Sequence, residues 1–348
     1  MNIEEVLSLV RPNIAGLKPY STARDEYDGP LGIYLDANES PFANGYNRYP
    51  DPHQRALKQK LSGIKGISPE RIFVGNGSDE AIDLLLRIFC EPRTDKAMTV
   101  SPTYGMYSVA ASINNVNVIE MPLGDDFGFD ADAMMSAAGP DVKLMFLCSP
   151  NNPTGNSFPA LEVKRLLRGF RGVVVVDEAY IDFSDRGSLV PLLDRYPNLV
   201  VLQTLSKAWG MAGLRLGMAF AAPEVVALMS RVKYPYNINA VTQEIVAARL
   251  EEDISAGVRL IVSERRRIFA ALEKLPAVSR VWPSDANFIL ARFPDPGMVY
   301  GMLIDAGIIV RDRSHIPGCE GCLRITVGTP EENDRLLDVL SGVLNGCY

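Results

Sequence analysis

The chain is short of histidine, of net positive charge and of long apolar runs, and each shortage excludes a class of protein. Two histidines, His53 and His315, occur among 348 residues, which argues against a multi-histidine metal site or a histidine-based catalytic triad. The net charge is −7, so we expect neither a nucleic-acid partner nor an anionic membrane surface. No apolar run approaches the roughly 18 residues of a membrane-spanning helix, and no membrane partner is predicted.

Cysteine is also sparse, and the five cysteines fit reduced thiols better than a disulfide framework. Cys319 and Cys322 form a single C-x-x-C with His315 upstream. A fourth zinc ligand is missing, so we predict no metal site and ordinary thiols, with metal binding or redox chemistry as the alternative. The N-terminal Met1-Asn2-Ile3-Glu4-Glu5 carries acids where a signal peptide carries bases, which predicts a cytoplasmic protein.

Length and composition suit a globular enzyme with one large and one smaller domain, since 47% of residues are hydrophobic and 22% charged. From Gln54 onward, apolar runs alternate with helical patterns, which predicts an α/β fold with a mostly parallel, doubly wound sheet. The predicted strands are 71–75, 97–101, 116–121, 143–148, 172–177, 199–204 and 216–220, and the helices 79–91, 104–113, 131–138 and 159–168.

The pattern of residues in the C-terminal third predicts a smaller α+β unit. A helical tract runs from Asn239 to Leu275, with one break expected near Ser255–Gly257. Strands are predicted at 279–282, 286–291, 308–311 and 322–327, and helices at 298–306 and 331–344. The predicted division is an N-terminal arm at 1–35 that packs with the small domain and includes a short strand at 31–35, a large domain at 36–240, and a small domain at 241–348.

Several predicted strands are followed by groups that could bind a ligand, and ligands of open α/β sheets bind at the carboxyl ends of strands. Asn76-Gly77-Ser78-Asp79 opens a helix and could cradle a phosphate, although an ordinary helix cap is the alternative. Tyr104 could cover a flat ligand or belong to the core. The turn from Ser149 to Gly155 presents the amide of Asn152, or is simply a turn.

Two further strand ends carry charged groups. Asp177 ends a run of four valines, so its carboxylate should be buried and in need of a cation or several donors, unless it caps a helix. Lys207 lies between Ser206 and Arg215 after the run 199–202, and partial drying of its amine would make it a nucleophile, although most lysines are solvated.

Together these groups supply what pyridoxal phosphate requires: an amine for its aldehyde, a carboxylate for its ring nitrogen, an aromatic face and a phosphate cradle. The chain resembles the fold-type-I pyridoxal-phosphate aminotransferases and, within them, the histidinol-phosphate aminotransferases. The segments that carry the resemblance are 35–39 (LDANE), 48–52 (RYPDP), 75–80 (GNGSDE), 149–155 (SPNNPTG), 177–180 (DEAY), 204–215 (TLSKAWGMAGLR) and 323–329 (LRITVGT).

The resemblance implies a role for each cofactor residue. Lys207 is the Schiff-base lysine and then the acid or base of the 1,3-proton shift, while Asp177 pairs with the pyridinium nitrogen. Tyr180 and Asn152 hydrogen-bond the ring O3′ oxygen, and Tyr104 stacks on the ring. The cofactor phosphate is held by residues that open the first helix and flank the lysine: Gly77, Ser78, Asp79, Ser206 and Arg215.

For the substrate, the resemblance implies amino transfer between L-histidinol phosphate and 2-oxoglutarate, giving imidazole-acetol phosphate and L-glutamate in histidine biosynthesis. Arg324 takes the glutamate carboxylate through a bidentate fork. Arg311 joins it on the histidinol phosphate group, with a solvated pair of Arg311 and Arg313 as the alternative.

Four further positions match the family's substrate and partner residues. Tyr20, Asn38 and Asn287 are implied to lie near the substrate. Tyr49 is implied to reach the cofactor phosphate of a neighbouring subunit, which makes a homodimer the active unit.

Some residues depart from the family pattern, and other functions remain possible. Gln203 and Trp209 stand where the family often has Arg and Phe, and Ala43 replaces a frequent glycine. An aromatic amino-acid aminotransferase or a phospho-amino-acid decarboxylase would keep the same fold and cofactor. A cofactor-sensing regulator is disfavoured, because the chain is acidic and the aminotransferase-like region begins within its first few dozen residues.

Overall fold

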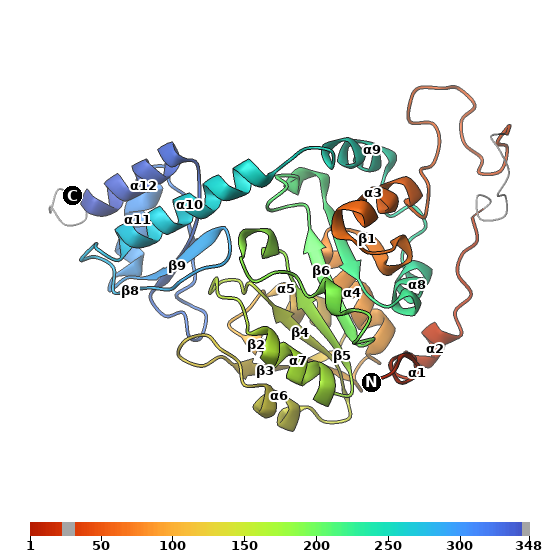
Figure 1. Cartoon of the computed structure of the whole chain (residues 1–348), viewed down its shortest axis with the longest axis horizontal. Coiled ribbons are helices and arrows are strands. Elements are labelled where there is room, and N and C mark those ends of the chain that lie inside the picture. The colour runs from red at the N-terminus through yellow and green to blue at the C-terminus, as the bar shows by residue number, and fades with distance from the viewer. Residues whose placement is uncertain (23–31, 343–348) are drawn as a thin grey trace.

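The computed structural model describes residues 1–22 and 32–342, and its centre is a seven-stranded sheet (Figure 1). The strand order is β1-β7-β6-β5-β4-β2-β3. Strand β7 runs antiparallel to both of its neighbours, and the other pairs of this sheet are parallel. The strands are β1 Ile72–Asn76, β2 Lys96–Ser101, β3 Asn117–Pro122, β4 Val142–Cys148, β5 Val173–Asp177, β6 Leu199–Thr204 and β7 Leu216–Phe220. The predicted α/β class with a mostly parallel sheet is confirmed.

The valine run of β5 shows why this sheet can be covered on both faces. Side chains alternate across a strand, and Val174 and Val176 enter one hydrophobic cluster whereas Val173 and Val175 enter another. Apolar residues at successive positions therefore bury both faces, as expected for strands inside an α/β domain.

Helices cover each face of the large sheet, which makes it doubly wound. The first cluster contains residues of α3 Arg55–Lys65, α6 Ala131–Ala137, α7 Ala160–Gly169 and α9 Ala240–Arg249. The second contains residues of α4 Ser78–Phe89, α5 Met106–Ile113 and α8 Pro223–Val232. Short 3-10 helices lie at η2 Pro69–Arg71, η3 Ile181–Phe183, η4 Val190–Leu192 and η5 Ala212–Leu214.

A second, antiparallel sheet organises the C-terminal part, with the strand order β10-β11-β9-β8. Its core is shared with three helices, and this unit lies beside the large sheet in Figure 1. The elements are α10 Ser255–Leu272, β8 Arg280–Val281, β9 Phe288–Arg292, α11 Pro296–Asp305, β10 Arg311–Asp312, β11 Cys322–Thr326 and α12 Pro330–Gly342.

The predicted helical tract is two helices, and their packing partners differ. Val246 of α9 and Leu250, which follows it, lie in the large-domain core, whereas Ile268 and Leu272 of α10 lie in the small-domain core. The break falls between α9 and α10, earlier than expected, and Asp253 within it accepts from the backbone N–H of Ser255, the first residue of α10. The chain therefore passes from the large-domain core to the small-domain core between α9 and α10, later than the predicted domain boundary after residue 240.

The N-terminal arm packs on the large domain, so the expectation that it packs with the small domain is wrong for its two helices, α1 Ile3–Leu7 and α2 Pro12–Ala15. Val6, Val10 and Ile14 are buried in the same cluster as α4 and α8. Arg11 Nε donates to Glu91 at 3.0 Å. These three side chains come from two short helices and the turn between them, and they lie in one cluster with the apolar residues of α4 and α8. Residues 32–35 form no strand, and Leu31 lies outside the described residues.

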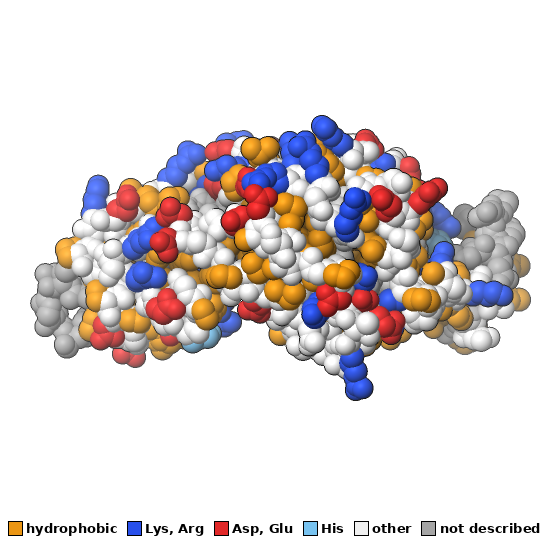
Figure 2. Space-filling model, turned by 90° about the horizontal axis from the view of Figure 1, so that it is seen from below, with side chains coloured by type: hydrophobic (Ala, Val, Ile, Leu, Met, Phe, Trp, Pro, Cys, Tyr) orange, Lys and Arg blue, Asp and Glu red, His pale blue; other side chains and the backbone are white. Residues whose placement is uncertain are grey.

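The described part of the chain shows neither a membrane-spanning helix nor a metal-binding cluster. None of its helices is long and apolar enough to cross a membrane. Figure 2 shows basic and acidic side chains interspersed over one face. Cys319 and Cys322 are buried beside Trp282, and the described residues contain no group of three or more His, Cys, Asp and Glu side chains that could hold a metal ion.

Candidate active site

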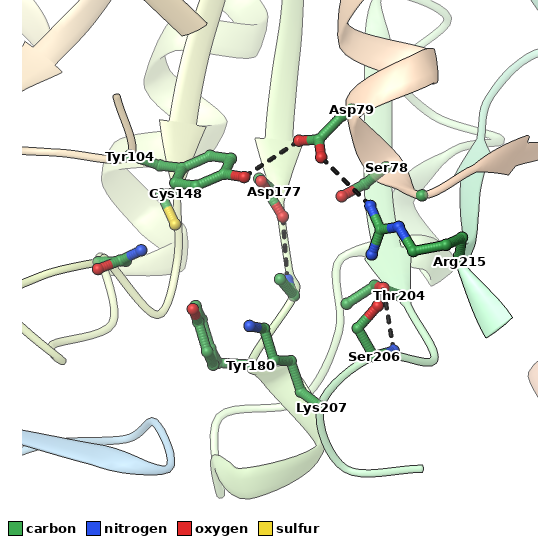
Figure 3. A pocket seen from close by; sticks show the side chains of 13 residues that line it. Ser78, Asp79, Tyr104, Cys148, Asp177, Tyr180, Thr204, Ser206, Lys207 and Arg215 are labelled. Carbon is green, nitrogen blue, oxygen red and sulfur yellow. Dashed lines mark hydrogen bonds and ion pairs between the residues drawn. The ribbon is translucent and has the colours of Figure 1, made fainter. Parts of the chain in front are cut away.

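The strand ends bring the predicted residues together. Strands β1, β4, β5 and β6 run parallel, so their carboxyl ends share one edge of the sheet, and antiparallel β7 begins at that same edge. A cavity of about 100 Å³ opens there (Figure 3). Its lining includes all of the predicted cofactor residues except Tyr49: Gly77, Ser78, Asp79, Tyr104, Asn152, Asp177, Tyr180, Ser206, Lys207 and Arg215.

The carboxylate of Asp177 is buried at the floor of this cavity, with 2% of the residue exposed. One carboxylate oxygen accepts from the Tyr107 hydroxyl at 2.9 Å and the other from the backbone N–H of Ala179 at 3.0 Å. Burial raises the pKa of Asp177 to about 6, although both hydrogen bonds and the charge of Lys207 oppose that rise. Among the described residues, no cation forms an ion pair with this carboxylate, and its two oxygens have hydrogen-bond donors only.

Lys207 extends from the turn after β6 toward the same space. Its Nζ lies 5.4 Å from the centre of the Tyr180 ring, and Figure 3 shows the two side chains pointing into the cavity together. The pKa of Lys207 is lowered, first by partial desolvation and then by the positive charge of Arg324. A larger fraction of the amine is therefore neutral and nucleophilic near neutral pH than for a fully solvated lysine.

An anion cradle lies at the start of α4. Gly77 precedes the helix with φ of +76°, and a Cβ there would come within 2.7 Å of the Arg215 guanidinium. No side chain caps this helix, so first-turn N–H groups of Ser78 and Asp79 face the cavity without intrahelical partners. Helix N-termini with free N–H groups and a nearby guanidinium favour an anion such as phosphate.

The cradle depends on a close approach that the sequence did not reveal. Gly217 on β7 packs against the start of α4, and a Cβ at that position would lie 2.1 Å from the backbone nitrogen of Ser78. The backbone N–H of Gly77 also donates to the carbonyl of Arg215 at 2.8 Å. Glycine at 217 thus lets the helix N-terminus and Arg215 meet.

Asp79 holds two other cavity residues in place. It accepts a hydrogen bond from the Tyr104 hydroxyl at 3.1 Å and lies 3.6 Å from the Arg215 guanidinium. Across the cavity, the Ser206 hydroxyl lies 3.0 Å from the Thr204 hydroxyl, which also accepts from the Ser206 backbone N–H. The polar groups of the cradle are therefore oriented before any ligand arrives.

The two adjacent asparagines after β4 play different parts. Asn151 is fully buried and ties the turn together, since it accepts from the Thr103 hydroxyl at 2.7 Å and donates to the Pro102 carbonyl at 2.9 Å. Asn152 faces the cavity, and its Oδ1 accepts a hydrogen bond from Arg324. The predicted fixed turn is found, and it connects the cofactor side to the small domain.

Arginines gather beside Asn152. Arg324 on β11 pairs in register with Arg311 on β10, and its guanidinium lies 5.2 Å from the Phe288 ring centre. Burial and the charges of Arg313 and Arg311 lower the pKa of Arg324. The Nε atoms of Arg324 and Arg313 are buried and lack hydrogen-bond partners in the described structure. Such a concentration of positive charge suits an anionic ligand.

None of the predicted substrate residues is part of the cavity lining; Arg324 reaches it through Asn152, and the others lie further away. Tyr20 is 75% exposed, and Asn38 is exposed on the segment that leads to Tyr49. Tyr49 stacks on Tyr236 with ring centres 4.4 Å apart, in a separate hollow that Asn38 also lines. Asn287 is half-buried before β9, where its carbonyl accepts from the N–H of Val327.

Four lining or supporting residues were missed: Tyr107, Cys148, Ala179 and Thr204. Cys148 and Thr204 are the last residues of predicted strands, and Cys148 pairs with Asp177 in register. Their position alone could have indicated them. Tyr107 follows Tyr104 by three residues, a spacing that places side chains on one side of a helix, and this was the available signal.

Comparison with known families agrees with this geometry. Residues 36–340 match the model of aminotransferase class I and II, and the chain belongs to this family. It is 49% identical to the histidinol-phosphate aminotransferase of Parabacteroides distasonis, covering 98% of this chain and 99% of the relative. It is 54% identical to that of Cytophaga hutchinsonii, covering 96% and 97%.

A solved structure is similar as well. The histidinol-phosphate aminotransferase of Clostridium acetobutylicum superposes with a TM-score of 0.79 at 25% identity, covering 86% of this chain and 91% of that one. The family and fold predicted from the sequence are thus confirmed.

Proposed function

We propose that this chain is a pyridoxal-phosphate aminotransferase that moves the amino group between L-histidinol phosphate and 2-oxoglutarate. The products are imidazole-acetol phosphate and L-glutamate, in histidine biosynthesis. The observation that carries the proposal is the single cavity in which Lys207, Asp177, Tyr180 and the anion cradle meet, beside an arginine pair that suits a phosphate or carboxylate. The names of the close relatives favour the same reaction.

The residues present fit pyridoxal phosphate. Asp177 is a buried carboxylate whose two oxygens each have a donor but no contacting cation, so a protonated ring nitrogen would complete it. The cradle of Ser78, Ser206 and Arg215 would hold the phosphate, and Tyr104 would cover the ring. Asn152 and Tyr180 would donate to the ring oxygen. When bound, the cofactor supplies an aldehyde for the amino group and an electron-accepting ring.

The protein's own groups then bind, orient and carry protons. Lys207 Nζ, partly neutral because its pKa is lowered, would accept a proton from the substrate carbon that bears the amino group and deliver it two atoms further along, as a 1,3-proton shift requires. The negative charge of the Asp177 carboxylate would keep the ring nitrogen of the cofactor protonated. Arg324 and Arg311 orient each substrate by its anionic group, as guanidiniums do with carboxylates and phosphates.

Tyr20, Asn38 and Asn287 remain proposed substrate residues. Tyr20 and Asn38 are exposed in a single chain, so their role requires that the segment carrying them meets a substrate held elsewhere. A second subunit would provide such a site, in line with the role proposed for Tyr49.

We propose a homodimer in which Tyr49 completes the neighbouring site. The segment that leads to Tyr49 carries large apolar side chains that a single chain leaves open, since Ile33, Leu35 and Phe42 are 91%, 89% and 81% exposed. Contiguous exposed apolar side chains favour a protein partner. A cytoplasmic location stays a prediction of the sequence.

Mixed dimers test the role of Tyr49. Tyr49→Ala and Lys207→Ala should each be inactive alone. If Tyr49 acts across the interface, a heterodimer of the two has one site with both native residues, and a one-to-one mixture should recover roughly a quarter of wild-type activity by random pairing. Absence of recovery in dimers shown to exchange subunits would contradict the proposal.

The substrate claim is tested by competition between amino donors. We expect kcat/KM for histidinol phosphate to exceed that for phenylalanine by at least about 100-fold with 2-oxoglutarate as acceptor, because the arginine pair is left unmatched by phenylalanine. Histidinol, which lacks the phosphate, is the matched control. A preference for phenylalanine would favour the aromatic aminotransferase alternative, and release of CO₂ would favour the decarboxylase.

A further inference from the structure

Tyr107 is a buried phenol that contacts the Asp177 carboxylate and that the mechanism above does not use. It lies on α5 and is 1% exposed, and its hydroxyl donates to Asp177 Oδ2 at 2.9 Å. The other oxygen of the carboxylate receives the N–H of Ala179. One side-chain donor and one backbone donor therefore fix the carboxylate in a single orientation.

The ring of Tyr107 is held as firmly as its hydroxyl. It stacks on Phe146 of β4, with ring centres 5.0 Å apart and planes 11° apart. The edge of Tyr104 meets it at 5.5 Å and 86°. Offset stacking and edge-to-face contact are the favoured arrangements of aromatic pairs, so the hydroxyl cannot swing away from Asp177 without disturbing both rings.

The direction of this hydrogen bond is fixed by the chemistry of its partners. Burial, and then the negative charge of Asp177, raise the pKa of Tyr107 well above its usual range. The phenol therefore keeps its proton and donates. Donation to the charged form of a carboxylate favours that form, and it opposes the burial that favours the neutral acid.

We infer that Tyr107 is a positioning residue for the cofactor: its hydroxyl keeps the Asp177 carboxylate charged and aimed at the ring nitrogen, so that this nitrogen stays protonated. The inference rests on the proposed function in that it requires pyridoxal phosphate in the cavity. It does not depend on which amino donor the enzyme prefers. Tyr107 touches neither substrate nor cofactor in this assignment and acts through Asp177.

Other charged and titratable groups around Asp177 set the background for this effect. Asp79 raises the pKa of Asp177 and Lys207 lowers it. The negative charge of Asp177 in turn raises the pKa of three neutral groups. These are Cys148 on β4, Tyr104 before α5 and Tyr180 after β5. Tyr107 is distinguished from all of them because it is the side chain that hydrogen-bonds the carboxylate.

Tyr107→Phe in the holoenzyme tests the inference, because it removes one oxygen atom and keeps the stacked ring. With pyridoxal phosphate labelled with ¹⁵N in the ring, the chemical shift of the ring nitrogen reports its protonation across a pH titration. We expect the midpoint of deprotonation to fall by about one pH unit, and the cofactor dissociation constant to rise about 10-fold. The kcat should fall while KM for histidinol phosphate changes little.

Tyr196→Phe is the matched control. Tyr196 is also a buried tyrosine, and its hydroxyl accepts from Arg168 at 3.3 Å in the core away from the cavity. This variant should leave the nitrogen titration unchanged. If Tyr107→Phe does not fold, Phe146→Leu replaces it. In that variant the Tyr107 hydroxyl stays, but the Tyr107 ring loses the aromatic ring on which it stacks. We then expect a smaller drop of the deprotonation midpoint.

The outcomes separate this inference from the proposed function. A wild-type protein that takes up no pyridoxal phosphate would overturn both. A folded Tyr107→Phe holoenzyme, or Phe146→Leu in its place, with a wild-type ring-nitrogen titration would overturn the role of Tyr107 alone. A shifted titration in an enzyme that prefers another amino donor would support Tyr107 and refute the substrate assignment.

Discussion

The cofactor side and the substrate side of the cavity differ in how much of each a single chain assembles. On the cofactor side, Asp177, Lys207 and Arg215 come from ends of adjacent strands and line one cavity. On the substrate side, Arg324 and Arg311 come from a separate sheet, and Tyr20 stands exposed. In our proposal, the large sheet therefore supplies the residues for the chemistry, whereas substrate recognition depends on the second domain and on a second copy of the chain.

Removal of Lys207 should have the largest effect, since it removes the nucleophile of the cofactor side. We expect Lys207→Ala to lower kcat by at least about 10⁴-fold, as loss of a covalent catalyst does in other enzymes. Lys60→Ala is the matched control, because Lys60 pairs with Glu251 on the surface. Borohydride reduction followed by peptide mapping should find the cofactor on Lys207, and attachment to any other lysine would contradict the assignment.

The neighbouring carboxyls Asp177 and Glu178 sharpen the contrast within the cofactor side. Asp177→Asn should lower kcat by roughly 10²- to 10³-fold, because it removes a preorganised charge from the reacting ring. Glu178→Gln should leave turnover within a few fold. Glu178 faces Ser188, Leu189 and Gln203 instead of the cavity. Steady-state kinetics of the two variants check this, and equal losses would show that burial alone explains the effect.

On the substrate side, Arg324→Lys keeps the charge and loses the planar fork. We expect kcat/KM to fall by roughly 10- to 100-fold for both glutamate and histidinol phosphate. Arg311→Lys should be milder and affect mainly the phosphorylated substrate. Arg280→Lys, away from the cavity over Trp282, is the control. If Arg311→Lys weakened glutamate more than histidinol phosphate, the division of labour between the two arginines would be wrong.

The smallest expected effect concerns the stability of the apoprotein. Burial raises the pKa of Glu178 to about 7 and that of Asp177 to about 6. Both groups bind protons more readily folded than unfolded, so the free energy of unfolding should rise as pH falls from 8 to 5.5, by about 2–3 kcal/mol. Denaturant titrations measure this, and Glu178→Gln should remove most of the slope; an unchanged slope would mean that other groups cause it.

The sequence predicts the large sheet well because its strands need apolar residues at successive positions, as in Val173–Val176. The residues that end these strands follow from the same pattern, so Asp177 and Lys207 could be predicted together. The class of cofactor came from that grouping, and the roles of Arg324 and Tyr49 came from resemblance.

Other features depend on which surfaces meet, and a single sequence does not contain that information directly. Val6, Val10 and Ile14 are apolar and favour burial, but the sequence does not show that α4 and α8 cover them. Gly217 is one glycine among 28 until the start of α4 is seen against it. Tyr107 fits a core position equally well, and only the fold brings its hydroxyl to Asp177.

The hairpin of β6 and β7 has a consequence of its own. Its turn carries both Lys207 and Arg215, which line the cavity and are still open to solvent in the chain without a ligand. A protease that cleaves after lysine and arginine therefore has two targets in one accessible turn. A ligand that contacts both side chains at once would protect the turn from cleavage. The rate of cleavage there would therefore measure how much of the site is occupied, without an assay of turnover.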